Sequence, residues 1–195
     1  MHSAENGAEV QDLGAARHWY ALYTRHQHEK SVTQALSNRG HEVFLPLVCA
    51  AHRWQDRTKQ LWLPLFPCYV FIRGGVDRRV QILSTPGIIS VVAWAGRPAI
   101  IPPLQIDTVR QMIESTLQVA PYPFLQCGDR VTVVAGPLRG IEGILVRKRN
   151  MFRLVVSMEM LGRSAAVEVD ISCIEASSPS PAPVAIQSHR FSASA

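Results

Sequence analysis

Long apolar runs and closely paired cysteines are both missing from this chain of 195 residues. No apolar stretch approaches the ~18 residues of a membrane-spanning helix, so we expect no membrane anchor. The N-terminal segment has neither the basic start nor the apolar core of a signal peptide, which predicts a cytoplasmic protein. The cysteines contain no C-x-x-C pair, so we expect half-buried thiols rather than a zinc site or a disulfide framework. They are widely scattered, at Cys49, Cys68, Cys127 and Cys173.

Motifs for catalysis are also absent. The sequence has no Gly-x-Ser-x-Gly elbow, no phosphate-binding loop and no acid pair with an evident partner. His26 and His28 form a short His-x-His pair, but no cysteine or carboxylate lies at a ligand spacing, and a structural metal needs four ligands. We therefore expect no enzyme, no metal site and no cofactor.

The net charge of +5 is unevenly distributed along the chain. Residues 17–126 carry 12 basic and 6 acidic side chains, whereas residues 127–175 carry 7 and 6. A moderately basic domain attracts phosphate polymers, but ordinary protein surfaces often have a similar imbalance. Charge alone therefore does not decide whether the protein contacts nucleic acid. It does predict that any such contact lies in the first part of the chain.

Composition predicts two domains with a tail at each end. Residues 1–16 are polar and without periodicity, and residues 176–195 are rich in Ser, Pro and Ala, so we expect both to be disordered. Residues 118–126 contain two prolines and no charge, as is typical of a linker. The expected domains are therefore residues 17–117 and 127–175.

The first domain alternates between strand and helix patterns. Gly40 is placed to end the first helix, and Pro102 with Pro103 opens the last one, where Ile106, Val109, Ile113 and Leu117 form a stripe. The order β-α-β-β-α-β-α predicts an α+β sandwich, in which helices cover one side of an antiparallel sheet. The expected elements are strands at 18–24, 41–48, 68–73 and 88–94, helices at 28–40, 76–84 and from 102, and a hairpin at 52–65.

The second domain has mostly alternating apolar residues between turn signals. Five short strands in so small a segment predict a barrel, because closure protects the sheet edges. Gly140 and Gly143 lie where a positive φ or a close backbone approach is needed. Val and Ile in these segments also favour strands over a helical hairpin.

Four sequence segments together resemble one known family. GDRVTVVAGPLRGIEGILV (128–146) resembles the KOW motif, and residues 153–175 look like the rest of the C-terminal barrel of the NusG family of transcription elongation factors. HWYALYTRHQHEK and PLFPCYVFIR are similar to the opening strand and helix and to the F-P-x-Y segment of that family's N-terminal domain. The resemblance implies an antiparallel α/β sandwich followed by a small SH3-like five-stranded KOW barrel.

The resemblance also implies a partner, since the family's N-terminal domain holds the clamp helices of RNA polymerase in an apolar groove. It places Tyr23, Phe66, Pro67 and Tyr69 in that groove, whereas Leu65 is expected in the core. Pro67 restricts the backbone, so little entropy is lost on docking. The pattern alone instead favours aromatic rings that fill the domain's own core.

Basic residues and one loop complete the implied contacts. Arg25 and His26 correspond to the family's approach to non-template and upstream DNA, and Arg78 and Arg79 to a second polymerase contact. A solvated basic face is the alternative for all four. Met160, Leu161 and Arg163 correspond to the KOW loop that binds a ribosomal protein or the termination factor Rho. Leu161 replaces the usual Phe there, and it could instead pack on its own barrel.

These features predict a monomeric transcription elongation or antitermination factor that suppresses pausing or termination. The hairpin at 52–65 and the departure at Leu161 favour an operon-specialised paralogue. A housekeeping NusG that couples transcription to Rho or the ribosome is the first alternative. A KOW-type RNA-binding or ribosome-associated protein is the second, although it predicts a basic barrel and residues 127–175 are nearly neutral.

Overall fold

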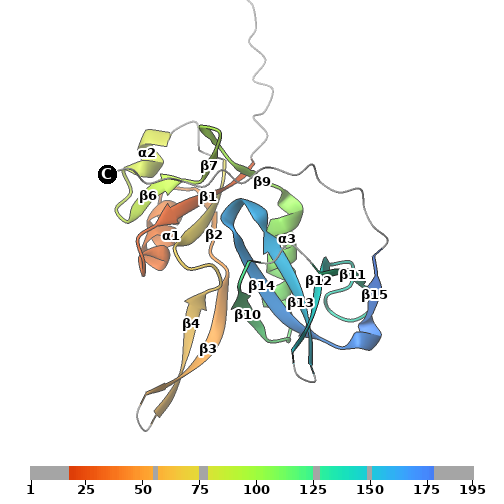
Figure 1. The fold of residues 1–195 in the computed structure, drawn as a ribbon. Coiled ribbons are helices and arrows are strands. Elements are labelled where there is room, and N and C mark those ends of the chain that lie inside the picture. The colour runs from red at the N-terminus through yellow and green to blue at the C-terminus, as the bar shows by residue number, and fades with distance from the viewer. Residues whose placement is uncertain (1–17, 55–56, 75–78, 125–127, 149–150, 178–195) are drawn as a thin grey trace, which may run out of the picture. The chain divides into compact units, whose positions relative to one another are not determined.

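A computed structural model describes residues 18–54, 57–74, 79–124, 128–148 and 151–177. The chain divides into two compact units, residues 1–107 and 108–195 (Figure 1). Apart from residues 176 and 177, the two expected tails lie outside the described residues.

The first unit is built on an antiparallel sheet. Leu22, Val70 and Ile72 from the sheet pack with Val32 and Leu36 of α1 (Glu29–Asn38) in one buried cluster. Ile82 of α2 (Arg79–Leu83) joins the same cluster, so both helices cover one face of the sheet. The strand order is β2 (Glu42–Phe44), β5 (Tyr69–Arg73), β1 (Trp19–Thr24) and β6 (Ile88–Val91), and β9 (Ile100–Ile101) also pairs with β1.

The opposite face of this sheet carries aromatic rings. Side chains alternate between faces along a strand, so Trp19 and Tyr23 point away from Leu22. Phe44 lies between Trp19 and Phe71, with ring centroids 6.5 Å and 6.0 Å away. This row of rings gives the sheet a second apolar face, beyond the one that the helices cover.

Helix α1 ends where the sequence predicts. Gly40 has a φ of +79°, a conformation that glycine adopts without steric cost. The amide of Gly40 donates to the carbonyl of Ser37 at 2.9 Å, and the amide of His41 donates to the carbonyl of Leu36 at 3.1 Å. These two bonds are those of a Schellman cap, which satisfies carbonyls that the helix leaves free.

Two hairpins extend from the first unit. Strands β3 (Leu47–Trp54) and β4 (Arg57–Pro64) pair only with each other among the described residues, and the ribbon projects from the sheet (Figure 1). The predicted hairpin at 52–65 is therefore present and begins earlier than expected. The predicted strand 88–94 is interrupted after β6, because β7 (Ala93–Trp94) pairs with β8 (Arg97–Pro98).

Helix α3 (Pro103–Glu114) begins at the predicted prolines and crosses the division between the two units. Ile106, Val109 and Met112 are its buried residues. The expected stripe is thus wrong at its far end, since Ile113 is only half-buried and Leu117 lies beyond the helix.

The second unit contains an antiparallel sheet of six strands. The five strands predicted in residues 127–175 are all present, as strands rather than as a helical hairpin. The order of the six strands in the sheet is β10 (Val119–Tyr122), β14 (Arg163–Val169), β13 (Met151–Met158), β12 (Glu142–Lys148), β11 (Asp129–Val133) and β15 (Ile174–Ala176).

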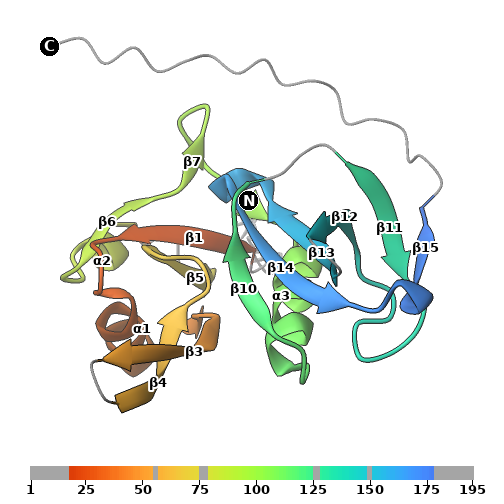
Figure 2. The same ribbon diagram turned by 60° about the horizontal axis from the view of Figure 1, so that its bottom comes forward.

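The additional strand, β10, corrects the expectation of a linker at 118–126. It pairs antiparallel with β14 from Val119↔Val167 to Tyr122↔Ser164, and Figure 2 shows it along the outer side of that strand. An edge strand tolerates Pro121 because the amide that proline lacks is not needed on the unpaired side. Of the two prolines that suggested a linker, Pro121 therefore lies in an edge strand, and Pro123 follows the end of that strand.

Among the described residues, no helix has both the length and the apolar composition needed to cross a membrane.

Candidate functional site

A tight turn at residues 66–69 joins the hairpin to strand β5. The amide of Tyr69 donates to the carbonyl of Phe66 at 3.2 Å, and Cys68 has a φ of +68°. Proline at the second position and a positive φ at the third define the type II form of this turn. Pro67 therefore stabilises the reversal, and its missing amide donor costs no strand hydrogen bond.

Phe66 lies in the core, so the expectation that its ring lines a surface groove is wrong. The side chain is 1% exposed, and its ring contacts the Phe71 ring edge-on at 6.2 Å between centroids. Leu65 is fully buried, as expected. Phe66 extends the row of aromatic rings on the sheet. Burial of its ring stabilises the folded state, because it removes apolar surface from water.

Tyr23 and Tyr69 are the rings that reach the surface. They are direct partners in the pairing of β1 with β5, and their ring centroids are 5.5 Å apart at an interplanar angle of 53°. Tyr23 is 39% exposed and Tyr69 is half-buried, and Pro67 beside them is exposed. Two adjacent strands therefore hold a pair of packed aromatic rings at the edge of the aromatic face.

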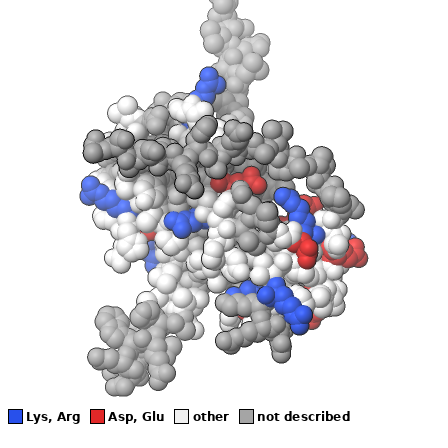
Figure 3. Space-filling view, in the orientation of Figure 1, with Lys and Arg blue, Asp and Glu red and all other residues white. Residues whose placement is uncertain are grey.

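The predicted basic contacts are only partly described. Arg25 and His26 follow β1 and are exposed, and the amide of Arg25 donates to the carbonyl of Gly87 at 2.8 Å. Arg79 is the first residue of α2, but its side chain and all of Arg78 lie outside the described residues. On the face in Figure 3, the described Lys and Arg side chains lie in small separate groups, and acidic side chains adjoin some of them.

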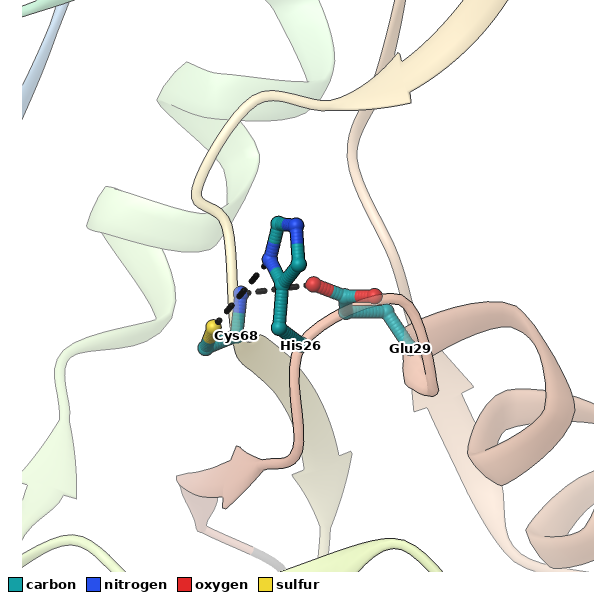
Figure 4. Close-up of side chains that lie close together, drawn as sticks. All are labelled: His26, Glu29 and Cys68. Atoms are coloured by element: carbon teal, nitrogen blue, oxygen red, sulfur yellow. Dashed lines mark hydrogen bonds between the residues drawn. The ribbon is translucent and has the colours of Figure 1, made fainter.

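His26, Glu29 and Cys68 converge in one cluster (Figure 4), and Cys68 is the neighbour of Tyr69 in the chain. The Cys68 amide donates to Glu29 Oε1 at 2.7 Å, and Cys68 Sγ lies 3.9 Å from His26 Nδ1. One ligand atom from each residue lies within 4.8 Å of the others. Sequence spacing does not reveal this cluster, because Cys68 is 39 and 42 residues away from Glu29 and His26 in the chain.

The loop at residues 159–163, where the resemblance implies partner binding, has a buried leucine at its centre. Leu161 ends a short 3-10 helix, η2 (Glu159–Leu161), and is only 7% exposed. Met160 is half-buried and Arg163 is exposed. The burial of Leu161 agrees with the alternative in which this side chain packs within the fold.

Comparison with known proteins gives the chain its family. Residues 17–110 match the family model described as "Transcription termination factor nusG". Residues 17–110 are by this match a domain of the NusG family. It is 27% identical over 183 residues to the transcription termination/antitermination protein NusG of Staphylococcus carnosus and to that of Staphylococcus epidermidis. Each match covers 85% of this chain and 98% of the relative.

A solved structure of Thermotoga maritima NusG is also similar to this NusG-family chain. It has a TM-score of 0.49 and 20% identity, and the match covers 82% of this chain and 97% of that one. At the level of the family, the chain is a NusG-like factor of transcription termination or antitermination. Members of this family are transcription factors rather than enzymes, which supports the expected lack of catalysis.

Proposed function

We propose that this protein binds the clamp helices of RNA polymerase through the surface around Tyr23 and Tyr69, and that it thereby suppresses pausing or termination. The exposed ring pair is the observation that carries this proposal. Pro67 extends the surface, whereas Phe66 supports it from the core.

The ring pair suits an interface for physical reasons. Tyrosine offers a large apolar surface with a polar tip, and each ring has few torsions to immobilise on binding. Both rings already contact each other on paired strands, so their arrangement requires little ordering when a partner docks. A factor that binds the active state of polymerase more tightly than the paused state shifts the population toward the active state.

Further contacts follow from the same docking. In this proposal Arg25 and His26 approach non-template or upstream DNA, and Arg78 and Arg79 contact the other side of the polymerase cleft. The six-stranded sheet of the second unit forms the KOW barrel. Met160 and Arg163 bind a ribosomal protein or Rho there, and Leu161 contributes only if the loop opens.

An operon-specialised role is the form of this function that we favour. The hairpin of β3 and β4 exposes Leu61, Trp62 and Leu63, with 40%, 57% and 43% of each residue accessible. Such a projecting apolar ribbon is suited to a contact beyond the tyrosine surface. Mapping of the protein on the chromosome separates the roles, because a housekeeping factor would occupy most transcribed genes.

Polymerase capture tests the main proposal. We expect the Tyr23→Ala/Tyr69→Ala variant to bind purified core RNA polymerase at least about thirtyfold more weakly, as loss of a ~2 kcal/mol hot spot requires. Trp94→Ala is the matched control, since Trp94 is an exposed ring on the separate β7–β8 hairpin. Equal affinities for the two variants, or recovery with ribosomes and never with polymerase, would refute the proposal.

A further inference from the structure

We propose that His26, Glu29 and Cys68 form a binding site for a thiophilic divalent metal ion, with Zn²⁺ as the best match. Cys68 Sγ, a His26 ring nitrogen and a Glu29 carboxylate oxygen are the ligands. The inference is independent of polymerase binding, because it rests only on the contacts of these three side chains.

The ligand types and distances fit such an ion. Zinc binds thiolate at about 2.3 Å, imidazole nitrogen at about 2.0–2.1 Å and carboxylate oxygen at about 2.0–2.2 Å. An ion can therefore bridge the 3.9 Å between Cys68 Sγ and His26 Nδ1 at these bond lengths. All three ligand atoms lie within 4.8 Å of one another, so a side-chain movement of about one ångström brings the carboxylate oxygen to the same ion.

Glu29 begins α1, where the helix dipole offsets part of the cost of its buried charge, and a bound cation would offset more. It is 3% exposed, and within the described ranges it makes no ion pair. A buried carboxylate is costly without a compensating charge. The hydrogen bond from the Cys68 amide orients the carboxylate, as outer hydrogen bonds orient ligating carboxylates in metal sites.

The backbone of Cys68 fixes where its thiol lies. A φ of +68° is costly for a residue with a Cβ, and the third position of this turn normally takes glycine. Strain of this kind is often kept for function. Here it places a thiol against an imidazole and a carboxylate that come from the loop after β1 and the start of α1.

The consequence of binding is local. Cys68 precedes Tyr69, and His26 follows closely after Tyr23, so the ion would join the two segments that carry the ring pair. Three protein ligands leave one coordination position for water or for a group of a partner.

Zinc titration of the purified full-length chain tests the site. After removal of metal with a chelator, we expect one Zn²⁺ to bind in calorimetry. With Co²⁺ as a probe, we expect an absorption band of thiolate-to-metal charge transfer together with the visible bands of a four-coordinate ion.

Three variants assign the ligands. Cys68→Gly removes the thiol and relieves the backbone, His26→Ala removes the imidazole, and Glu29→Gln keeps an acceptor for the Cys68 amide. Each should weaken Zn²⁺ binding by more than about a hundredfold, because even second-shell changes cost 10–100-fold. Cys49→Ser is the control, since Cys49 is an exposed thiol outside the cluster and its loss should change nothing. Absence of binding, or binding that survives all three changes, would overturn the proposal.

Discussion

Phe66 and Tyr69 are joined by a hydrogen bond of 3.2 Å between the Tyr69 amide and the Phe66 carbonyl, yet their rings have different surroundings. The Phe66 ring packs edge-on against Phe71 in the core. The Tyr69 ring packs against Tyr23 near the surface. One turn therefore supplies both the support and the exposed part of the candidate binding surface.

Removal of the Phe66 ring should destabilise the protein. Phe66→Ala deletes a fully buried side chain, and we expect a loss of about 3–5 kcal/mol in the free energy of unfolding. Urea denaturation monitored by circular dichroism measures this loss. Phe66→Leu, which retains most of the apolar volume, should cost clearly less. A loss below about 1 kcal/mol for the alanine variant would contradict the burial of this ring.

The contact between Tyr23 and Tyr69 should be measurable apart from polymerase binding. Aromatic pairs of this geometry contribute about 0.5–1.5 kcal/mol beyond the surface that they bury. A double-mutant cycle with Tyr23→Ala, Tyr69→Ala and the double variant, followed by urea denaturation, isolates this energy. Additive effects of the two changes would show that the rings do not interact in solution.

Replacement of Cys68 by glycine should stabilise the metal-free protein. A positive φ costs a residue with a Cβ roughly 1–2 kcal/mol, and the flexibility of glycine in the unfolded chain offsets about 0.5–1 kcal/mol of the gain. We expect a net gain of up to about 1 kcal/mol, measured by thermal unfolding in the presence of a chelator. Cys68→Ala retains the Cβ and should not show this gain in stability. A lower stability of the Cys68→Gly variant would contradict the positive φ of Cys68 in this turn.

A methyl group at Gly143 should disrupt the second unit. A Cβ there would lie 2.7 Å from the carbonyl oxygen of Val155 and 2.9 Å from Leu154 Cδ1. The neighbouring strand must shift to make room, so Gly143→Ala should cost about 1–3 kcal/mol in urea denaturation. Glu142→Ala is a suitable control, because Glu142 is the exposed neighbour on the same strand. Equal stability of the two variants would mean that β12 and β13 lie farther apart at Gly143 than this structure shows.

Asp170 should make a small pH-dependent contribution to stability. Hydrogen bonds from the amide and the hydroxyl of Ser172 lower the pKa of this carboxyl from its ordinary value of 3.8. The ionised form is favoured in the folded state, so its contribution is present above that ordinary value and is lost as the pH falls through the lowered pKa. NMR titration should show a pKa below 3.8 that returns toward it in Ser172→Ala. An unshifted pKa in the unaltered protein would exclude these hydrogen bonds from Ser172.

Local patterns predicted much of the fold because their physical causes are local. Gly40 ends α1 through its positive φ, and Pro103 begins α3. Gly140 and Gly143 lie, as expected, at a positive φ of +87° and at a close backbone approach. Alternation of apolar residues gave the five strands of the second unit. The strand β10 was missed because a proline such as Pro121 is compatible both with a linker and with the edge of a sheet.

By itself, the sequence determined the two-part organisation, the main elements and the likeness to the NusG family, since periodicity and turn residues act over a few neighbours. Only the tertiary structure decided that Phe66 is core while Tyr69 faces outward, because burial depends on what packs against each ring. It likewise brought Cys68 to His26 and Glu29, since pairing of β1 with β5 joins segments that are about forty residues apart in the chain.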